Sequence, residues 1–388
     1  MTFSDCQTRS KNMIFGALVA DAAALGTHWI YDQAHIAAIA PETPEFTPPL
    51  AKNYEGVMGF FAHGGRGSGA QSQYGEQALV MLRVLANAHG EFEAAEFAEA
   101  FQAHFGYGGE YIGYIDHATR DTLDNARRFE DRALQIAAEL GADVAPRTRK
   151  EIVAMAIPML ARMSGNTLET AFEKRLLADY DDAAQRNFGM ALLRQLQTTP
   201  RATGAVDIQL PATAKLPPLV AVLASAKDVA FDHDVASAVQ TTSDHPVAAE
   251  YGRIVSHMMR AALVDGTVAA VTQAAQTTAT GDAAALIAKA LGMSKTDNAR
   301  VTAEFGMACD LPYGVPSALH NIATAPDFAT AVRRNIYGGG DTCGRAMIVG
   351  AVAGALYGRD NPKGIPQAWI DRLAAKDEVN RLVSKLLD

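Results

Sequence analysis

The chain has 388 residues, with 43 acidic against 34 basic residues and a formal net charge of −9 at pH 7. This length allows one large domain or two to three domains of roughly 100–200 residues each. The acidic balance and the lack of a Lys/Arg block argue against nucleic acid as a main partner, because phosphate contacts need a basic patch. A composition of 49% hydrophobic and 20% charged residues excludes a disordered chain.

The number of cysteines and the lack of long apolar segments indicate the cellular compartment in which the protein is expected. Three widely spaced cysteines, Cys6, Cys309 and Cys343, do not form a disulfide framework. The polar N-terminal segment lacks the apolar region of a signal peptide, and the apolar run Ala346 to Tyr357 is too short to span a bilayer. We therefore expect a cytoplasmic protein with no membrane partner; the small-molecule substrate that we also expect rests on the motifs described below. The sequence does not indicate the oligomeric state.

Helical periodicity of apolar residues dominates the chain, and alanine, the best helix former, is abundant. Strand-like alternation is scarce. The pattern predicts an all-α protein with one domain over residues 1–388. The predicted helices, in chain order, are Arg9–Leu25, Glu76–Ala88, Glu93–His104, His117–Glu139, Lys150–Arg162, Thr167–Ala178, Asp181–Thr198, Leu216–Val229, Val235–Gln240, Pro246–Val264, Thr267–Ala275, Asp282–Leu291, Val301–Ala308, Val315–Ile322, Asp327–Asn335, Cys343–Tyr357 and Gln367–Leu387.

Two stretches interrupt the helical pattern. Pro41–Gln73 is a long segment rich in Pro and Gly that contains the run HGGRGSG. A loop of this length inside a compact protein is more often functional than not. Thr199–Pro218 resembles an extended connection, and it is either a domain boundary or a link within one domain. Helices of similar character lie on both sides of it, which favours one domain.

The first predicted helix carries a carboxylate on its apolar face. Asp21 shares a stripe with Leu18 and Leu25 at spacings of three and four residues. Burying a carboxylate alone costs several kcal/mol, so Asp21 must be paired, hydrogen-bonded or a ligand. A purely structural hydrogen bond is the alternative to a role in a site. His28, two turns further on, would project in the same direction, or it packs with Trp29 at an aromatic helix end.

Two further polar groups precede predicted helices. Glu76 and Gln77 open a helix directly after the glycine-rich loop. The helix dipole alone favours an acid in a first turn, so Glu76 also has a structural explanation. Ser243 or Asp244 is a plausible N-cap for the helix that follows. His245 either completes that cap or faces a pocket.

The strongest chemical signal is the segment Asn335–Gly358, which places Gly338, Gly339 and Gly340 before a helix that starts at Asp341-Thr342-Cys343. Glycines allow a sharp turn and a close approach to a ligand. The free N–H groups of a helix start suit an anion, and the same field is expected to lower the pKa of a thiol in the first turn. Cys343 is therefore a candidate nucleophile.

The same segment has a structural interpretation as well. A glycine turn with an inert buried cysteine is the alternative, although Asp, Thr, Cys and Arg345 all crowd one helix start. Gly350 and Gly354 would allow another helix to cross this one closely.

The order of these motifs resembles the ADP-ribosylglycohydrolase family. GGDT followed by IVGAVAGALYG is similar to its C-terminal motif, and FGALVADA is similar to its first helix. Pieces at Ser243–Pro246 and Val315–Leu319 fall in the expected order. The resemblance spans nearly the whole chain and implies an all-α globule with a central cleft. It also implies a two-metal Mg²⁺ site that hydrolyses the glycosidic bond of ADP-ribose.

Three departures appear where the resemblance implies metal ligands. At the first, this chain has His28 where the family has Glu. At the second, it has Gly75-Glu76-Gln77 in place of Thr-Asp-Asp. At the third, it has Asp341-Thr342-Cys343-Gly344 in place of Asp-x-Asp-Thr. Two Mg²⁺ ions need several hard oxygen ligands. Glu76, Gln77 and Asp341 would remain, so we expect no cofactor, with a single Mg²⁺ on these three residues as the alternative.

The substitutions bring a histidine, a cysteine and carboxylates together, which are the parts of a thiol nucleophile system. The leading hypothesis is a hydrolase of a small polar substrate at a C–N or C–O bond. Cys343 would be the nucleophile, His28 its base and Glu76 or Asp341 the orienter, with the N–H groups of Gly338–Thr342 stabilising negative charge. The residues expected to contact substrate are Asp21, Tyr74, Gly339, Gly340, Thr342, Arg345 and His245.

Two alternatives remain open. One is a Mg-dependent ADP-ribosyl hydrolase of the parent type. The other is a non-catalytic binding protein, because HWIYD, YGEQ and GGDTC together resemble the branch with J1-crystallin-like proteins and selenoprotein J.

Overall fold

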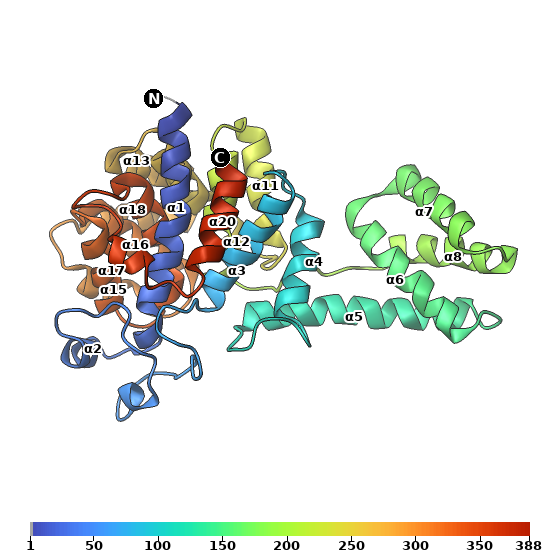
Figure 1. Cartoon of the computed structure of the whole chain (residues 1–388), viewed down its shortest axis with the longest axis horizontal. Coiled ribbons are helices and arrows are strands. Elements are labelled where there is room, and N and C mark those ends of the chain that lie inside the picture. The colour runs from blue at the N-terminus through green and yellow to red at the C-terminus, as the bar shows by residue number, and fades with distance from the viewer. Residues whose placement is uncertain (1–2) are drawn as a thin grey trace. The chain divides into compact units, whose positions relative to one another are not determined.

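The computed structural model describes residues 3–388. Within that range it consists of helices joined by loops, with three isolated β-bridges and no sheet (Figure 1). The prediction of an all-α protein is confirmed. No helix of the described chain is long and apolar enough to cross a membrane.

The chain forms two compact units by its internal contacts. The first contains the residues up to Thr119 together with Val206–Asp388, and the second contains Arg120–Ala205. The chain therefore leaves the first unit after Thr119, within α5 (His117–Leu140), and returns to it at Val206, within the segment Thr199–Pro218 that was predicted as an extended connection. The single domain expected over residues 1–388 stays a prediction, because a division by contacts does not test independent folding.

The helices of the first unit include the long central pair α1 and α18. Their bounds are α1 (Phe3–Ala24), η1 (Leu25–Thr27), α2 (Gln33–Ile39), η2 (Ala51–Tyr54), α3 (Gln73–Asn87), α4 (Ala94–Phe105), α9 (Pro211–Ala214), α10 (Leu216–Leu223), α11 (Asp228–Gln240), α12 (Pro246–Val264), α13 (Val268–Thr278), α14 (Gly281–Gly292), α15 (Asn298–Phe305), α16 (Leu311–Thr324), α17 (Phe328–Tyr337), α18 (Thr342–Tyr357), α19 (Gln367–Ile370) and α20 (Lys376–Leu387).

The predicted helices agree with the structure in their order, and α12 agrees at both ends. The short helices α2 and α9 were not predicted, because four to seven residues carry too little periodicity. The helix predicted over Gln367–Leu387 is two helices. Between them the N–H of Ala374 donates to the carbonyl of Gly69 at 2.9 Å, so a bond to the long loop replaces a bond within the helix.

Helices α1 and α18, from opposite ends of the chain, pack closely along each other in the core (Figure 1). A Cβ added at Gly16 would lie 2.2 Å from the carbonyl oxygen of Gly350, and one added at Gly354 would lie 2.3 Å from that of Asn12. Only glycine allows two backbones to approach so closely. The close crossing predicted from Gly350 and Gly354 is therefore confirmed, and it brings Asp21 and Cys343 to one place.

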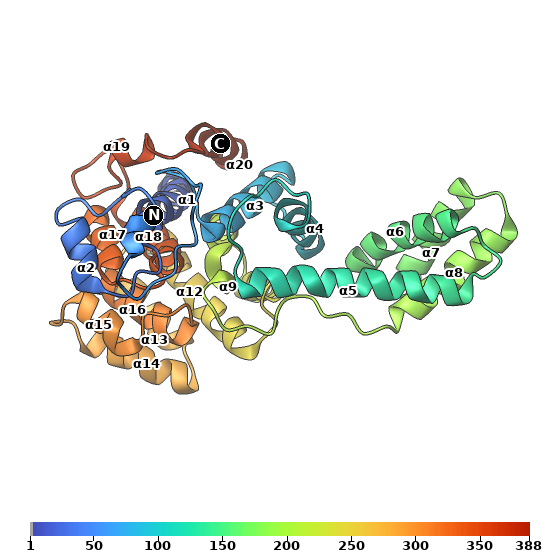
Figure 2. The ribbon, with the colours of Figure 1, turned by 90° about the horizontal axis from the view of Figure 1, so that it is seen from below.

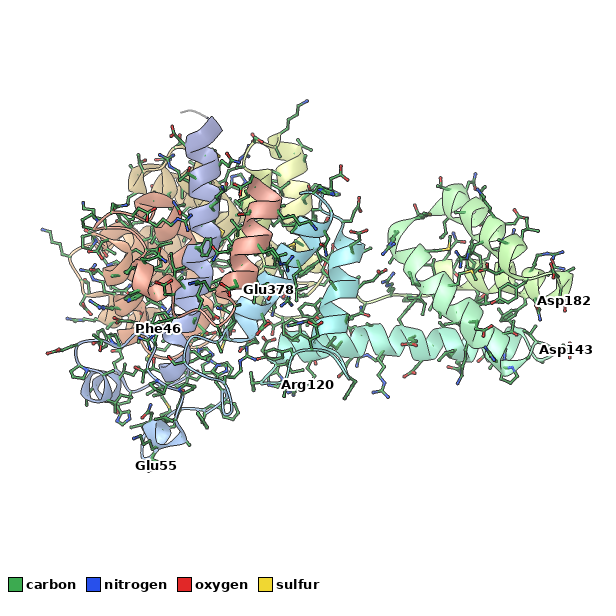
Figure 3. The ribbon with its side chains drawn as sticks, in the orientation of Figure 1. Phe46, Glu55, Arg120, Asp143, Asp182 and Glu378 are labelled. Atoms are coloured by element: carbon green, nitrogen blue, oxygen red, sulfur yellow. The ribbon has the colours of Figure 1, made fainter. Side chains whose placement is uncertain are left out.

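The long loop Pro41–Gln73 is held on the first unit by its backbone and by Phe46. The N–H of Phe46 donates to the carbonyl of Ala23 at 2.8 Å, and its ring centroid lies 5.9 Å from that of Trp369. Figure 3 labels Phe46 and also Glu378 on α20, whose carboxylate pairs with Arg83 of α3 at 2.7 Å. Apart from η2 the loop has no helix, in agreement with the prediction.

The second unit has its own apolar core. It contains most of α5 (His117–Leu140), together with α6 (Pro146–Arg162), α7 (Gly165–Asp179) and α8 (Ala183–Gln197), which are seen together in Figure 2. Phe172, Leu176 and Leu192 are fully buried in this core. Asp182, labelled in Figure 3, caps α8 by accepting the N–H of Ala184 at 2.8 Å. None of the predicted site residues lies in this unit.

Candidate functional site

Asp21, at the core end of α1, is fully buried and hydrogen-bonded to the start of α3. Its carboxylate accepts the N–H of Ser72 at 2.8 Å and the hydroxyl of the same serine. Ser72 in turn caps α3 through the N–H of Tyr74. Burial raises the pKa of Asp21 to about 7, although both bonds from Ser72 oppose this. The predicted need of this carboxylate for a partner is confirmed, and the partner is Ser72.

The same carboxylate explains the glycine at position 75. A Cβ on Gly75 would lie 2.3 Å from Oδ2 of Asp21 and 2.1 Å from Oε1 of Gln71. The threonine implied at this position by the family resemblance therefore does not fit while Asp21 bonds Ser72.

Asp341 caps α18 and is fully buried. One of its oxygens accepts the N–H of Gly344 at 2.8 Å, and the other accepts the hydroxyl of Tyr74 at 2.6 Å. Burial raises the pKa of Asp341, while the bonds from Tyr74 and Gly344 oppose the rise. The structure thus brings Tyr74 and Asp341 together, with both carboxylate oxygens engaged by the protein.

His28 lies in the turn after η1, beside the start of α18. Its Nδ1 accepts the N–H of Cys343 at 3.2 Å and lies 3.7 Å from Oδ1 of Asp341. An accepting Nδ1 assigns the proton of the neutral ring to Nε2, which has no hydrogen-bond partner among the described residues. Burial lowers the pKa of His28 well below its usual value. In this arrangement Nε2 is a donor and has no free lone pair with which to act as a base.

The thiol of Cys343 is fully buried and lies against α1. Its Sγ donates to the backbone carbonyl of Asp21 at 3.7 Å. Burial raises its pKa well above the usual value, and the carboxyl groups of Asp21 and Asp341 raise it further. The expectation that the helix start lowers this pKa is wrong here, because the loss of solvent outweighs the helix field.

The glycine turn before α18 is bonded to the protein and not open to a ligand. Gly339 and Gly340 have φ of 68° and 63°, a conformation that favours glycine. Every N–H from Gly338 to Thr342 donates to a protein carbonyl. The accepting carbonyls are, in chain order of the donors, those of Arg334 and Asn335, Ile336, Ile30, Met307 and Gly340. The predicted stabilisation of negative charge by these N–H groups is therefore not supported, since none of them is free.

The side chains of Thr342 and Arg345, next to that turn, also make hydrogen bonds within the protein. The hydroxyl of Thr342 donates to the carbonyl of Ala24 at 3.3 Å. Arg345 is fully buried, where its guanidinium donates to the carbonyl of Gly339 and to Oδ1 of Asn335, the latter at 3.2 Å. These groups thus brace the turn, while Nη1 of Arg345 is buried without a hydrogen-bond partner among the described residues. The expected substrate contacts of Gly339, Gly340, Thr342 and Arg345 stay a prediction.

Glu76 and Gln77 face other partners. The carboxylate of Glu76 pairs with Arg66 at 2.5 Å and with Nε2 of His104 at 3.1 Å. Burial raises the pKa of Glu76, but the bonds from His104 and Arg66 outweigh burial and lower it overall. Gln77 is buried and donates to Thr119 at 3.4 Å. Glu76 therefore does not orient His28 in this structure.

His245 serves as the N-cap of α12. Its Nδ1 accepts the N–H of Val247 at 3.1 Å. The capping alternative for His245 is confirmed, whereas the predicted caps Ser243 and Asp244 are wrong by one or two residues. The proposed substrate contact of His245 is not supported, because the ring nitrogen is used at the helix start.

His63, from the long loop, is a site residue that the sequence analysis missed. Its ring centroid lies 5.1 Å from that of His28, and the ring stacks on Trp29. The ring is buried, and neither nitrogen has a partner among residues 3–388. One ring nitrogen of each histidine and Sγ of Cys343 lie within 4.8 Å of one another. The run HGGRGSG, which begins at His63, marked the loop but not the position of this ring.

The residues present do not fit the two magnesium ions that the family resemblance implies. Gly75 has no ligand atom, Cys343 offers sulfur, and Glu76 is paired with Arg66. Both oxygens of Asp341 accept bonds from the protein. Mg²⁺ requires an octahedral set of oxygen ligands, which these side chains do not provide.

Comparison with known proteins agrees with the fold. A model of the ADP-ribosylglycohydrolase family matches residues 3–388. Crystallin J1A of Tripedalia cystophora is 23% identical over 389 residues, covering 100% of this chain and 98% of that protein. A solved structure titled "ADP-ribosylglycohydrolase-related protein complex" has a TM-score of 0.56 at 17% identity and covers 99% of both chains. On its fold and on this match over nearly its full length, the chain belongs to the ADP-ribosylglycohydrolase family.

Proposed function

We propose that this protein is a hydrolase that cleaves a C–N or C–O bond of a small polar substrate at the site formed by Asp21, His28 and Cys343, without a binuclear magnesium centre. Membership of a glycohydrolase family supports the reaction class. The observation that carries the proposal is the meeting of His28 with Cys343, whose backbone N–H lies 3.2 Å from the histidine Nδ1. These two residues replace two oxygen ligands of the parent site.

Cys343 is the proposed nucleophile, but His28 is not suited to be its base in the observed arrangement. The Cys343 N–H bonded to Nδ1 keeps the ring proton on Nε2. Asp21 is better placed, because Sγ of Cys343 lies 3.7 Å from the backbone carbonyl of the same residue and burial raises the pKa of the Asp21 carboxyl group to about 7. A base with a pKa near the working pH is the most effective one. His28 then acts as a hydrogen-bond donor through Nε2.

The proposed reaction has two steps. The thiol proton moves to Asp21 while the sulfur bonds to the electrophilic carbon and the C–N or C–O bond breaks. The leaving nitrogen or oxygen takes that proton from Asp21. Water then attacks the carbon and gives one proton to Asp21, the C–S bond breaks, and the sulfur takes that proton from Asp21 to become the thiol again. The loop that carries His63 must move for substrate to enter, because that ring lies against His28.

The test uses the full-length protein after treatment with EDTA. A panel of small N- and O-glycosides and amides is incubated with the wild type, Cys343→Ala and the control Cys6→Ala, and products are identified by mass spectrometry. We expect turnover to fall by more than tenfold, about 1.4 kcal/mol of barrier, in Cys343→Ala alone. Equal turnover by both variants would overturn the thiol mechanism. Release of ADP-ribose that depends on added Mg²⁺ would establish the parent-type reaction instead.

A non-catalytic protein is the second candidate, and the burial of the site favours it. The side chains of Asp21, His28 and Cys343 all have an exposed fraction of 0%. The relative from Tripedalia cystophora is named a crystallin. A protein of this kind would turn over no member of the panel, and at most it would be stabilised by a bound compound in a thermal-shift measurement. Detected products that require Cys343 would exclude it.

A further inference from the structure

We propose that His28, His63 and Cys343 form a binding site for Zn²⁺. The three residues come from the turn after η1, the long loop and the start of α18, and none of them exposes more than 1% of its surface. The proposal goes beyond the hydrolase function, because it concerns a metal-bound state of the same thiol.

The geometry is close to that of a zinc site. One ring nitrogen of each histidine and the sulfur of Cys343 lie within 4.8 Å of one another. Zinc bonds of about 2.0–2.3 Å in a tetrahedron place neighbouring ligand atoms roughly 3.3–3.8 Å apart. The three atoms must therefore move together by about 1 Å. His63 lies on a loop, so this residue is the one best able to make that movement.

Unpartnered nitrogens point to a missing ligand at this place. Within the described part of the chain, Nε2 of His28 and both ring nitrogens of His63 are buried without a hydrogen-bond partner. Leaving a buried polar group unsatisfied costs about 1–3 kcal/mol. Native structures rarely keep such groups, so each needs an explanation. A metal ion bound by both rings would satisfy one nitrogen of each.

The donor set selects zinc over magnesium. Two imidazoles and a thiolate suit Zn²⁺, whereas Mg²⁺ prefers oxygen. Three protein ligands also leave a fourth position for water. The thiol proton is released to solvent on binding, since only the thiolate is a good ligand.

A carboxylate is already in place to support His28 as a ligand. When Nε2 binds metal, the ring proton moves to Nδ1, which lies 3.7 Å from Oδ1 of Asp341. A histidine ligand that donates to a carboxylate is the usual arrangement around zinc. Tyr74 holds the other oxygen of Asp341 at 2.6 Å. Nδ1 would then donate to Asp341 and no longer accept the N–H of Cys343.

The two uses of Cys343 exclude each other. A sulfur that ligates zinc is not free to attack a substrate, so the zinc-bound form is expected to be inactive in the proposed hydrolysis. The metal site and the hydrolase function can therefore fail independently. Zinc binding is measured without turnover, and turnover is measured on protein freed of metal.

The test is a titration of the EDTA-treated full-length protein with Co²⁺, followed by displacement with Zn²⁺. We expect one equivalent of Co²⁺ with the absorption bands of a tetrahedral site and a thiolate charge-transfer band, and one Zn²⁺ per chain by mass spectrometry of the metal. His63→Asn should weaken zinc binding by at least tenfold, and Cys343→Ser should remove the charge-transfer band. His233→Asn, which changes an exposed histidine, and Cys6→Ser, which changes a cysteine of α1 outside the cluster, serve as matched controls and should bind normally.

Two results of this titration would show that the zinc site does not exist. Absence of the charge-transfer band in the wild type, or wild-type zinc affinity in His63→Asn, would overturn the proposal. If Cys343→Ser does not fold, the accessibility of the thiol provides a second measurement on the wild type. Zinc should then protect Cys343 from iodoacetamide in the wild type but not in His63→Asn, and equal labelling with and without zinc would contradict the site.

Discussion

The contact between α1 and α18 allows a quantitative prediction for Gly350→Ala. The added Cβ would lie 2.3 Å from the carbonyl oxygen of Gly16 and 2.4 Å from Cβ of Ala20. An ordinary contact begins near 3.4 Å, so the two helices must separate locally by about 1 Å. The obstacle at Gly16 is backbone, which has no alternative rotamer. The strain therefore falls on the packing of the whole helix pair.

The expected loss of stability is about 2–3 kcal/mol. Overpacking of a core typically costs about 1–3 kcal/mol, and a clash with backbone belongs at the upper end of that range or beyond it. The higher helix propensity of alanine offsets up to about 1 kcal/mol. The measurement is urea unfolding followed by circular dichroism. A lower midpoint with an unchanged slope would report the loss of stability.

Gly292→Ala is the matched control. Gly292 is the last residue of α14, it is exposed, and nothing lies within 4 Å of an added Cβ. The free energy of unfolding of Gly292→Ala should lie within about 0.5 kcal/mol of the wild-type value, with a slight increase as the other expected result. Equal midpoints for Gly350→Ala and Gly292→Ala would refute the reasoning that the close crossing depends on glycine.

Three further predictions concern titration and reactivity. Burial lowers the pKa of Lys215 to about 7, so between pH 7 and about 10 the unfolded chain binds a proton that the folded protein lacks. Stability should rise there by up to about 1.4 kcal/mol per pH unit, and Lys215→Met should remove this slope in urea midpoints measured at pH 7 and 9; an unchanged slope would contradict the burial of the charge. Burial raises the pKa of Asp21 to about 7, so the protonated carboxyl group binds its proton more tightly in the folded protein than in the unfolded chain. Its contribution to the free energy of unfolding is therefore fully present below about pH 4 and is lost as the pH rises to about 7. Asp21→Asn should remove this decline, and a variant that declines equally would show that another group is responsible. Finally, Cys6, which is partly exposed, should react with iodoacetamide at pH 8 at least tenfold faster than the buried Cys343, as measured by peptide mapping; the reverse order would contradict the burial of the Cys343 thiol.

Much of the fold follows from local patterns in the sequence. Apolar residues at helical spacing predicted α12 at both ends, and the glycines of α18 predicted its close approach to another helix. Such signals are local, because side-chain periodicity and the size of a residue act within one element. Helices such as α2 or the break before α20 depend on capping and on bonds to distant loops, and a local pattern does not contain them.

The site was predictable only in part. Asp21 on an apolar stripe indicated a buried carboxylate in need of a partner, and the match of His28 and Cys343 to metal-ligand positions indicated that they meet. The direction of the shift in the Cys343 thiol pKa was predicted wrongly. Position at a helix start is visible in a sequence, whereas the depth of burial that opposes the helix field is not.

The sequence by itself therefore determined the helical class, the family resemblance and the loss of the oxygen ligands for magnesium, because these depend on residue type and spacing. The tertiary structure alone decided which groups are free to act. It showed that the N–H groups of the Gly338–Thr342 turn are all bonded, and it placed His63 beside His28 and Cys343. Hydrogen bonds and burial involve residues far apart in the chain, so they are settled only when α1, α18 and the long loop pack together.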